Sequence, residues 1–273
     1  MLAVLCFAGG LLSASLVRLA PGYGVDEREL DPRLSQASME AIRNAHRVNS
    51  NLLSYYGRYL ARAIRGDLGS SEWLQQPISS LFKERFPVTA KSVASGVLLA
   101  WGIALAISLA NVLFPGFFVE ISGTLVSGLF IALPAAVVAI FSVYLHAPVF
   151  LAIAVVTFPK LFRYLRNLLG HAYSQPYVLA AQARGIGQAR ILFHHVLPLV
   201  SPALFALLGV SLSLAFGAAI PIEALCDSPG VGQLAWQAAL NRDLPLIVNL
   251  TLLITLITVA ANSLANVANE RAL

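Results

Sequence analysis

YVLAAQARGIGQARILFHHVLP, residues 177–198, is a polar and basic stretch that lies between long apolar runs. Pro176 suits the first position of a helix, and Gly185 can take the left-handed conformation that ends one. A second helical run is expected from Gln188 to about Pro198. The sequence therefore predicts two short helices joined at a glycine. Between membrane spans, such a pair forms a compact knob that suits docking to another protein.

The composition identifies a polytopic membrane protein. Of the 273 residues, 58% are hydrophobic and only 11% are charged, whereas a soluble domain has about 25% charged residues. The two cysteines, Cys6 and Cys226, provide neither a disulfide framework nor a metal-ligand spacing. The formal net charge of +5 has to be located along the chain before it is assigned to nucleic-acid binding or to membrane topology.

Five apolar runs are long enough to span a bilayer, at 88–113, 121–145, 148–167, 199–221 and 246–267. A sixth run, residues 2–17, is shorter than the roughly 20 residues that a span requires. A signal-peptide core is one interpretation of it. No basic leader precedes it and a helix stop, Leu19-Ala20-Pro21-Gly22, follows it. We therefore expect a first transmembrane helix at 1–17.

Residues 18–86 form the one extended polar region, with ten Lys or Arg and eight Asp or Glu. This near balance indicates a solvated surface and argues against a nucleic-acid partner. Apolar residues from Leu52 to Ile64 recur at helical spacing, which predicts an amphipathic helix along the membrane. That helix either packs on the membrane domain or offers a platform to a soluble partner. A short helix over 77–85 is expected to lead into the next span.

The distribution of charge predicts the topology. Between Ile121 and Ile222 there are five Lys or Arg and no Asp or Glu, which places 160–198 in the cytoplasm by the positive-inside rule. Both termini are then cytoplasmic, and residues 18–86 and the 222–245 loop lie outside. The predicted domains are a first transmembrane helix (1–17), an extracytoplasmic region (18–86) and a five-helix core (87–273) with a cytoplasmic loop at 174–198.

The residues expected in the spans offer no catalytic or metal-binding cluster. Lys91, Lys160 and Arg163 lie near span ends, where long side chains can reach the interface. Adjacent His194 and His195 point about 100° apart on a helix and make a poor metal pair. Without an evident proton or ion relay, energy for transport is expected to come from another subunit. Small polar residues are candidates for a solute path or for helix packing: Asn111, Ser122, Thr124, Ser127, Ser142, Ser211 and Ser213.

The knob resembles the Glu-Ala-Ala loop of ABC importer permeases, in the version found in dipeptide, oligopeptide and nickel importers. Ala-Ala, a following Gly and a terminal Leu-Pro recur there at the spacing seen here. Leu179 stands where the wider superfamily has its glutamate, which the peptide-importer branch often lacks. The resemblance implies these ATPase-coupling residues: Tyr177, Ala180, Ala181, Ala183, Arg184, Gly185, His195, Leu197 and Pro198.

The resemblance continues over nearly the whole chain. After the first span and in the outer regions, short motifs follow in the family's order, although residues 25–50 match poorly. The extracytoplasmic family motifs include Pro21, Gly22, Gly66, Asp67, Gly69, Glu223, Pro229, Gly230, Arg242 and Asp243.

The resemblance implies an all-α, six-span permease of the type I ABC importer fold in the bacterial inner membrane. Expected partners are a second homologous permease, two ABC ATPases that bind ATP and Mg, and an extracytoplasmic solute-binding protein. The chain itself would bind no cofactor and catalyse nothing. Its substrate is expected to be a di- or oligopeptide, with nickel or another small solute as the alternative. A stand-alone secondary transporter or an intramembrane enzyme is the competing class.

Overall fold

The computed structural model describes residues 66–113 and 127–272, with side chains to 263, together with Ser15, Gly57, Arg62 and Leu125. The first helix expected at 1–17, Pro21, Gly22 and the amphipathic helix near 52–64 lie outside these residues. The described part is helical, with one isolated bridge between Ser70 and Pro77. Its elements are α4 (Ile78–Leu113), α6 (Ala135–Tyr144), α7 (Val149–Tyr173), α8 (Pro176–Ala183), α9 (Gln188–Ile191), a π-helical turn (Leu192–Val196), α10 (Leu197–Leu225), α11 (Val231–Leu240) and α12 (Leu244–Ala272).

The chain divides into two compact units. Of the described residues, 66–84 and 235–256 belong to the first unit, and 85–113, 127–234 and 257–272 belong to the second. Within the described part, three helices are long and apolar enough to cross a membrane: Ile78–Leu113, Gln188–Leu225 and Leu244–Ser263. The expected all-α membrane class is confirmed, while the total of six spans stays a prediction.

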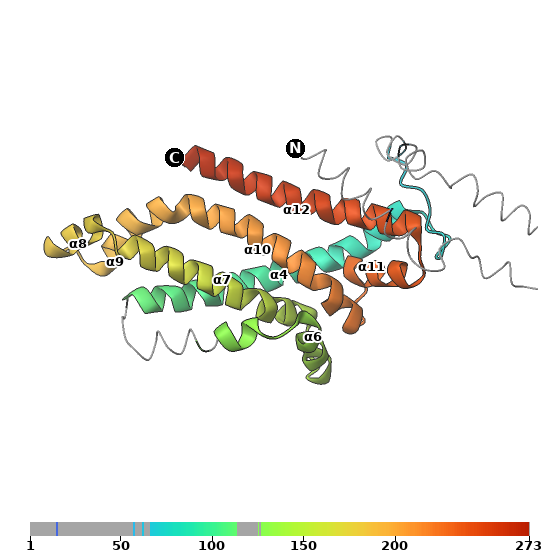
Figure 1. Cartoon of the computed structure of the whole chain (residues 1–273), viewed down its shortest axis with the longest axis horizontal. Helices are drawn as coiled ribbons and strands as arrows, with labels where there is room; N and C mark the ends of the chain where they lie inside the picture. The colour runs from blue at the N-terminus through green and yellow to red at the C-terminus, as the bar shows by residue number, and fades with distance from the viewer. Residues whose placement is uncertain are drawn as a thin grey trace, which may run out of the picture. The chain divides into compact units, whose positions relative to one another are not determined.

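Alanines and larger hydrophobic side chains together form the core of the second unit, where α4, α7 and α10 run lengthwise beside one another (Figure 1). Val97 of α4, Ile153 of α7 and Ala215 of α10 are buried in one cluster, to which α6 adds Val138. Ala100 and Ala104 continue the α4 surface against Phe162 and Leu165 of α7. Alanine and glycine at these contacts let helix backbones approach closely, as is usual in membrane bundles.

The apolar run 121–145 is not one continuous helix, contrary to the sequence prediction. Residues 127–131 are helical, the chain turns at 132–134, and α6 begins at Ala135. Pro134 causes this break because its ring disfavours helical geometry at the preceding residue and it has no N–H to donate. At the far end of α6 the chain turns before Pro148, with His146 at φ 52°.

The short helix expected over 77–85 forms the first part of α4, which runs unbroken from Ile78 through Pro87 to Leu113. Pro87 removes one hydrogen bond of the helix. The buried face of α4 on either side of it holds the helix together, with Leu81 before it and Val93 after it.

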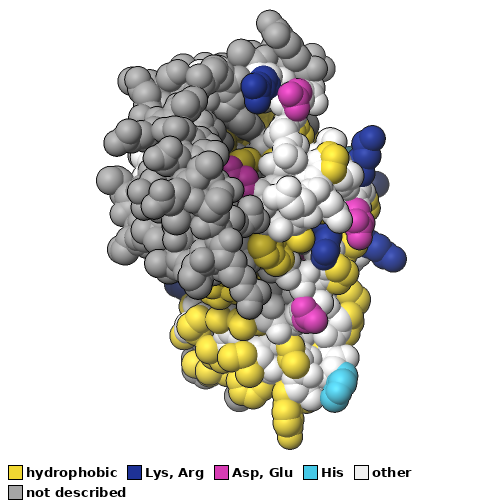
Figure 2. Space-filling view, turned by 90° about the vertical axis from the view of Figure 1, so that its right-hand side faces the viewer, with side chains coloured by type: hydrophobic (Ala, Val, Ile, Leu, Met, Phe, Trp, Pro, Cys, Tyr) yellow, Lys and Arg dark blue, Asp and Glu magenta, His cyan; other side chains and the backbone are white. Residues whose placement is uncertain are grey.

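Exposed hydrophobic side chains cover α6. Phe141, Val143, Tyr144 and Leu145 are all exposed, and Figure 2 shows hydrophobic side chains gathered over the lower part of the displayed face, where α6 lies. Exposed apolar surface of this kind fits contact with lipid or with another membrane subunit.

Gly96 sets the approach of α4 to α7. A Cβ atom added there would lie 2.8 Å from the carbonyl oxygen of Phe150 and 2.9 Å from Cγ2 of Ile153, whereas a Cβ at Gly102 on the same helix would meet nothing within 4 Å. We expect Gly96→Ala to destabilise the protein by about 1–3 kcal/mol through overpacking. Gly102→Ala should be neutral or stabilising by up to about 1 kcal/mol. Unfolding midpoints in detergent test this, and equal midpoints for the two variants would contradict the packing.

Candidate functional site

The knob, residues 174–198, has the expected helix–glycine–helix form. α8 begins at Pro176 and ends at Ala183, and Gly185 has φ +75°, the left-handed conformation predicted from the sequence. The amide of Gly185 donates to the carbonyl of Gln182 at 2.9 Å. The chain then turns into α9 at Gln188. Figure 1 shows α8 and α9 together at one end of the paired helices α7 and α10.

One face of the knob is buried. Val178 and Ala181, three residues apart on α8, pack with Ile191 and Val196 and with Leu169 of α7. The Tyr177 hydroxyl donates to the carbonyl of Ala172 at 3.3 Å. These contacts connect α8 both to the end of α7 and to the start of the following helix.

The opposite face of the knob is exposed and mainly apolar and basic. Ala180, Ala183, Arg184 and Gly185 are exposed, so the structure brings these predicted residues together on one surface. Leu179 joins them with 60% of its surface exposed. The sequence prediction treated Leu179 only as a departure from the superfamily pattern, although its four-residue spacing from Ala183 places these two residues on the same face.

The second half of the knob shows a further difference from the prediction. The helix that begins at Gln188 does not end near Pro198 but continues to Leu225 as one 38-residue helix. Pro198 has no N–H for the carbonyl one turn earlier. The π-helical turn at 192–196 fits this loss because it changes the local hydrogen-bond pattern.

The remaining predicted knob residues lie along this helix. His195 and Pro198 are exposed and Leu197 is half-buried. Phe193, which is not among the predicted knob residues, is 62% exposed beside the histidines.

Burial raises the pKa of the Tyr173 phenol, whose hydroxyl is buried without a hydrogen-bond partner where α7 ends. Within the described ranges, no group of three or more His, Cys, Asp or Glu is placed to hold a metal ion.

Glu223 lies at the other end of the same helix and is 0% exposed. The prediction put it in an outer loop, but it belongs to the last turn of α10. Its Oε2 accepts a hydrogen bond from the Thr89 hydroxyl at 3.0 Å and from the Gly232 amide at 2.7 Å. Thr89 in turn accepts from the amide of Val231 at 2.7 Å. Glu223 and Thr89 therefore attach the 226–232 turn to α4 and α10.

Gly230 and Gly232 make room for this carboxylate. A Cβ at Gly230 would lie 2.2 Å from Oε2 of Glu223, and one at Gly232 would lie 2.9 Å from the same oxygen. The glycines at this turn thus have a packing reason that the sequence alone did not show. Pro229 beside them is exposed.

Two further hydrogen bonds, which join three residues, extend this arrangement. Arg85 donates to the Gln233 side-chain oxygen at 3.0 Å, and Gln233 donates to Asp227 at 2.5 Å. The beginning of α11 is thereby attached to α4 by side chains as well as by the Thr89 hydroxyl.

Asp243, 1% exposed, organises the first unit in the same way. One carboxylate oxygen accepts from the Ser71 hydroxyl and from the Trp73 amide at 3.1 Å, and the other accepts from the Leu246 amide at 3.0 Å. This last bond caps the N-terminus of α12. Arg242 before it has φ 53°. One carboxylate thus connects the start of α12 to the turn at 71–77.

The remaining predicted motif residues form the start of that turn. Gly66 and Gly69 have φ +82° and +75°, a conformation that favours glycine. Asp67 accepts a hydrogen bond from the Gly69 amide at 3.0 Å. The residues predicted as one set of outer motifs therefore divide between the units, with Gly66, Asp67, Gly69, Arg242 and Asp243 in the first and Glu223, Pro229 and Gly230 in the second.

Comparison with known proteins supports the resemblance noted in the sequence. Residues 99–271 match the family described as binding-protein-dependent transport system inner membrane component. The chain is 28% identical to the oligopeptide transport system permease protein OppB of Escherichia coli, over 89% of this chain and 85% of that protein. It is 24% identical to the oligopeptide transport system permease protein AppB of Bacillus subtilis, over 94% and 90% of the two chains.

The hydroxyl of Thr89 is expected to be essential to the hydrogen-bonded group formed by Glu223, Thr89 and the amides of Val231 and Gly232, called here the Glu223 cluster. Thr89→Val keeps the shape but leaves the Val231 amide without its acceptor and removes one donor from Glu223. We expect a loss of about 1–3 kcal/mol in unfolding free energy, whereas Thr89→Ser, which keeps the hydroxyl, should lose less. Thermal unfolding in detergent distinguishes the two, and a Val variant as stable as the Ser variant would rule out this role.

Replacing Asp243 should loosen specific amides of the first unit. In Asp243→Ala, the amides of Trp73 and Leu246 lose their acceptor, and their hydrogen exchange should become about 10–100-fold faster, because a hydrogen bond to a charged group contributes about 1.5–3 kcal/mol. The Gly69 amide is the internal control, since it bonds to Asp67 instead. Equal acceleration at all three amides would indicate general unfolding and contradict a local role.

Proposed function

Because the chain belongs to the family of binding-protein-dependent transport system inner membrane components, we propose that it is a permease subunit of an ATP-driven peptide importer, coupled to a cytoplasmic ATPase through the knob. The observation that carries this proposal is the exposed face of α8 on a knob joined to a 38-residue helix long enough to cross a membrane. The relatives named as oligopeptide permeases support a peptide as the substrate. No observation favours nickel.

The exposed knob residues fit a protein groove. Ala180 and Ala183 allow close approach of another backbone, Leu179 adds an apolar contact, and Arg184 adds a positive charge. Gly185 sets the direction in which the chain leaves α8. The buried face of the knob holds α8 on α7 and the following helix, so a force applied to the exposed face is passed to both membrane helices.

The proposed mechanism is a rigid-body movement of the knob. Closure of two ATPases around ATP and Mg would displace the knob of each permease and change which side of the membrane the solute path opens to. The proposal includes a second homologous permease, which completes the path, and an external solute-binding protein, which delivers the peptide. The chain contributes no catalytic group to ATP hydrolysis.

We also propose the orientation. The basic residues Lys160, Arg163, Arg166, Arg184 and Arg190 support a cytoplasmic knob, by the positive-inside rule. The 222–245 segment with Glu223 is then extracytoplasmic, and both termini are cytoplasmic in a bacterial inner membrane.

The coupling role predicts a difference between two glycines of the knob. A Cβ meets nothing within 4 Å at either Gly185 or Gly187, but Gly185 has φ +75° and Gly187 has φ −64°. Gly185→Ala therefore carries a conformational cost of about 1–2 kcal/mol that Gly187→Ala does not. We expect Gly185→Ala, and more strongly Gly185→Val, to reduce copurification with the ATPase and peptide uptake. Gly187→Ala should retain both.

The uptake measurement uses proteoliposomes that contain this chain, the second permease and the ATPases, with the binding protein added. Uptake should require ATP inside and all the subunits. ATP-independent uptake by vesicles that contain this chain alone would overturn the proposal in favour of a stand-alone transporter. Equal copurification with the ATPase and equal peptide uptake in the Gly185 and Gly187 variants would show that the knob has no role in coupling.

A further inference from the structure

A cavity of about 380 Å³ lies at the break in the 121–145 run. Residues on either side of the break line it, together with α7 and α10. Its volume lies within the range of about 300–1,000 Å³ that is typical of small-molecule sites. Helices interrupted within a membrane are also where many transporters bind their solutes.

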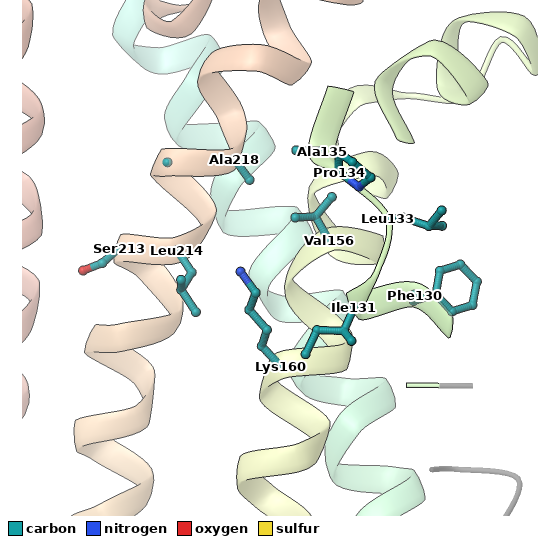
Figure 3. Close-up of a pocket in the computed structure, with 11 residues that line it drawn as sticks. Phe130, Ile131, Leu133, Pro134, Ala135, Val156, Lys160, Ser213, Leu214 and Ala218 are labelled. Atoms are coloured by element: carbon teal, nitrogen blue, oxygen red, sulfur yellow. The ribbon is translucent and has the colours of Figure 1, made fainter. Parts of the chain in front are cut away.

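Of the described residues that line this cavity, Lys160 is the one that is charged. Figure 3 shows its side chain rising from α7 between Leu214 of α10 and Val156 of α7, so that the ammonium points into the space between the helices. From the sequence, Lys160 is expected near a span end, where its side chain could reach the membrane interface. In the structure its side chain lines the cavity at the helix break.

The depth of Lys160 makes this orientation costly without an anion. It lies eleven residues after Val149, the first residue of α7, which corresponds to about 16 Å along a helix. In the span expected at 148–167, which would cross a hydrocarbon core about 30 Å thick, the side chain would then start near the middle. An ammonium group there is expensive unless it is hydrated or paired.

Within the described part of the chain, no residue makes a hydrogen bond or an ion pair with Lys160. The sequence from Ile121 to Ile222 contains no Asp or Glu that could do so. The hydroxyl of Ser213, which also lines the cavity, donates to the Gly209 carbonyl at 3.1 Å and accepts from Asn262 at 3.2 Å. Lys160 is therefore the group in the cavity that is available to an incoming ligand.

The helix break adds a second positive contribution. Pro134 and Ala135 line the cavity and form the N-terminal end of the ten-residue α6, which has no side-chain cap. The N-terminal end of a helix carries partial positive charge. Apart from Ser213, the other described lining residues are apolar, and apolar surroundings strengthen electrostatic attraction by lowering the local dielectric.

We propose that this cavity is a transient binding site for a carboxylate of the transported peptide, held by the Lys160 ammonium during passage. The apolar walls, among them Phe130, Ile131 and Leu133, accept the adjoining side chain without selecting its identity. A single ammonium that faces a partly open cavity holds the anion weakly enough to release it. The inference rests on the proposed function, because it names the part of a peptide that this site receives.

The test compares two peptides of one sequence, with a free or an amidated C-terminus, in the complete reconstituted transporter. Lys160→Gln should lower the uptake of the free-carboxylate peptide relative to the amidated peptide by about tenfold, the factor expected for loss of one hydrogen bond to a charged group. Lys160→Arg should restore the ratio. Lys91→Gln, which removes an exposed lysine of α4 outside the cavity, is the matched control and should leave the ratio unchanged.

The ratio of free-carboxylate uptake to amidated-peptide uptake is compared between permease variants. Because the binding protein is the same in every assay, a change in this ratio reports on the cavity. A third, amidated peptide with an internal Glu identifies the source of the carboxylate. Sensitivity of its uptake to Lys160→Gln shows that a side-chain carboxylate is also bound, and insensitivity assigns the site to the peptide terminus.

Other outcomes would overturn the inference. Equal loss for the free and amidated peptides in Lys160→Gln would give Lys160 a structural role. An unchanged ratio would show that it binds no peptide carboxylate. An effect that disappears in vesicles without anionic lipid would assign Lys160 to a lipid headgroup. Failure of the unsubstituted complex to move either peptide would instead contradict the proposed function, which keeps the two tests distinct.

Discussion

One unbroken helix from Gln188 to Leu225 is the constraint on which the second unit depends. At 1.5 Å per residue, its 38 residues extend about 57 Å. Its first turns carry the buried face of the knob, and its last turn carries Glu223. The π-helical turn at 192–196 keeps the helix continuous where Pro198 would otherwise interrupt its hydrogen bonds. In the proposed mechanism, a displacement of the knob would be passed along this one helix, whose far end carries Glu223.

Buried carboxylates give this apolar protein its specific connections. Glu223 accepts hydrogen bonds from the Gly232 amide and the Thr89 hydroxyl, and Asp243 accepts from two backbone amides and one hydroxyl, within separate units. Apolar packing between helices has little directional preference, whereas a buried carboxylate is costly unless its partners are in place. These two side chains hold turns and helix ends in one arrangement. This explains why acidic residues occur here although neither has a catalytic neighbour in the described part of the chain.

The Pro134 break provides a different kind of polar feature. An intact helix at 127–144 would satisfy its own backbone and leave little space, while the break opens a cavity lined by the end of α6. Lys160 faces this cavity from a continuous helix, α7. The rigid helices and the broken one thus have separate roles in the proposed transporter: the former transmit movement, and the latter provides a place for the solute.

The local features of the knob could be predicted from the sequence alone. Pro176 and Gly185 mark the start and end of α8 because proline and glycine have distinct backbone preferences that neighbours rarely override. The order of motifs and the absence of acidic residues from Ile121 to Ile222 likewise determined the family resemblance and the expected orientation. Hydropathy placed apolar helices correctly in α4, α10 and α12.

Tertiary structure alone decided where long-range partners meet and where helices break. Hydropathy does not distinguish a continuous helix from one that turns at Pro134, and the helix ends expected near Arg85 and Pro198 lie inside continuous helices. The bonds of Glu223 to Thr89 and of Asp243 to Ser71 join residues 134 and 172 positions apart. No local pattern encodes such pairs, because their energies depend on burial and geometry that exist only after the helices have packed. The direction of Lys160 was decided in the same way, since a flexible side chain follows the space that its neighbours leave.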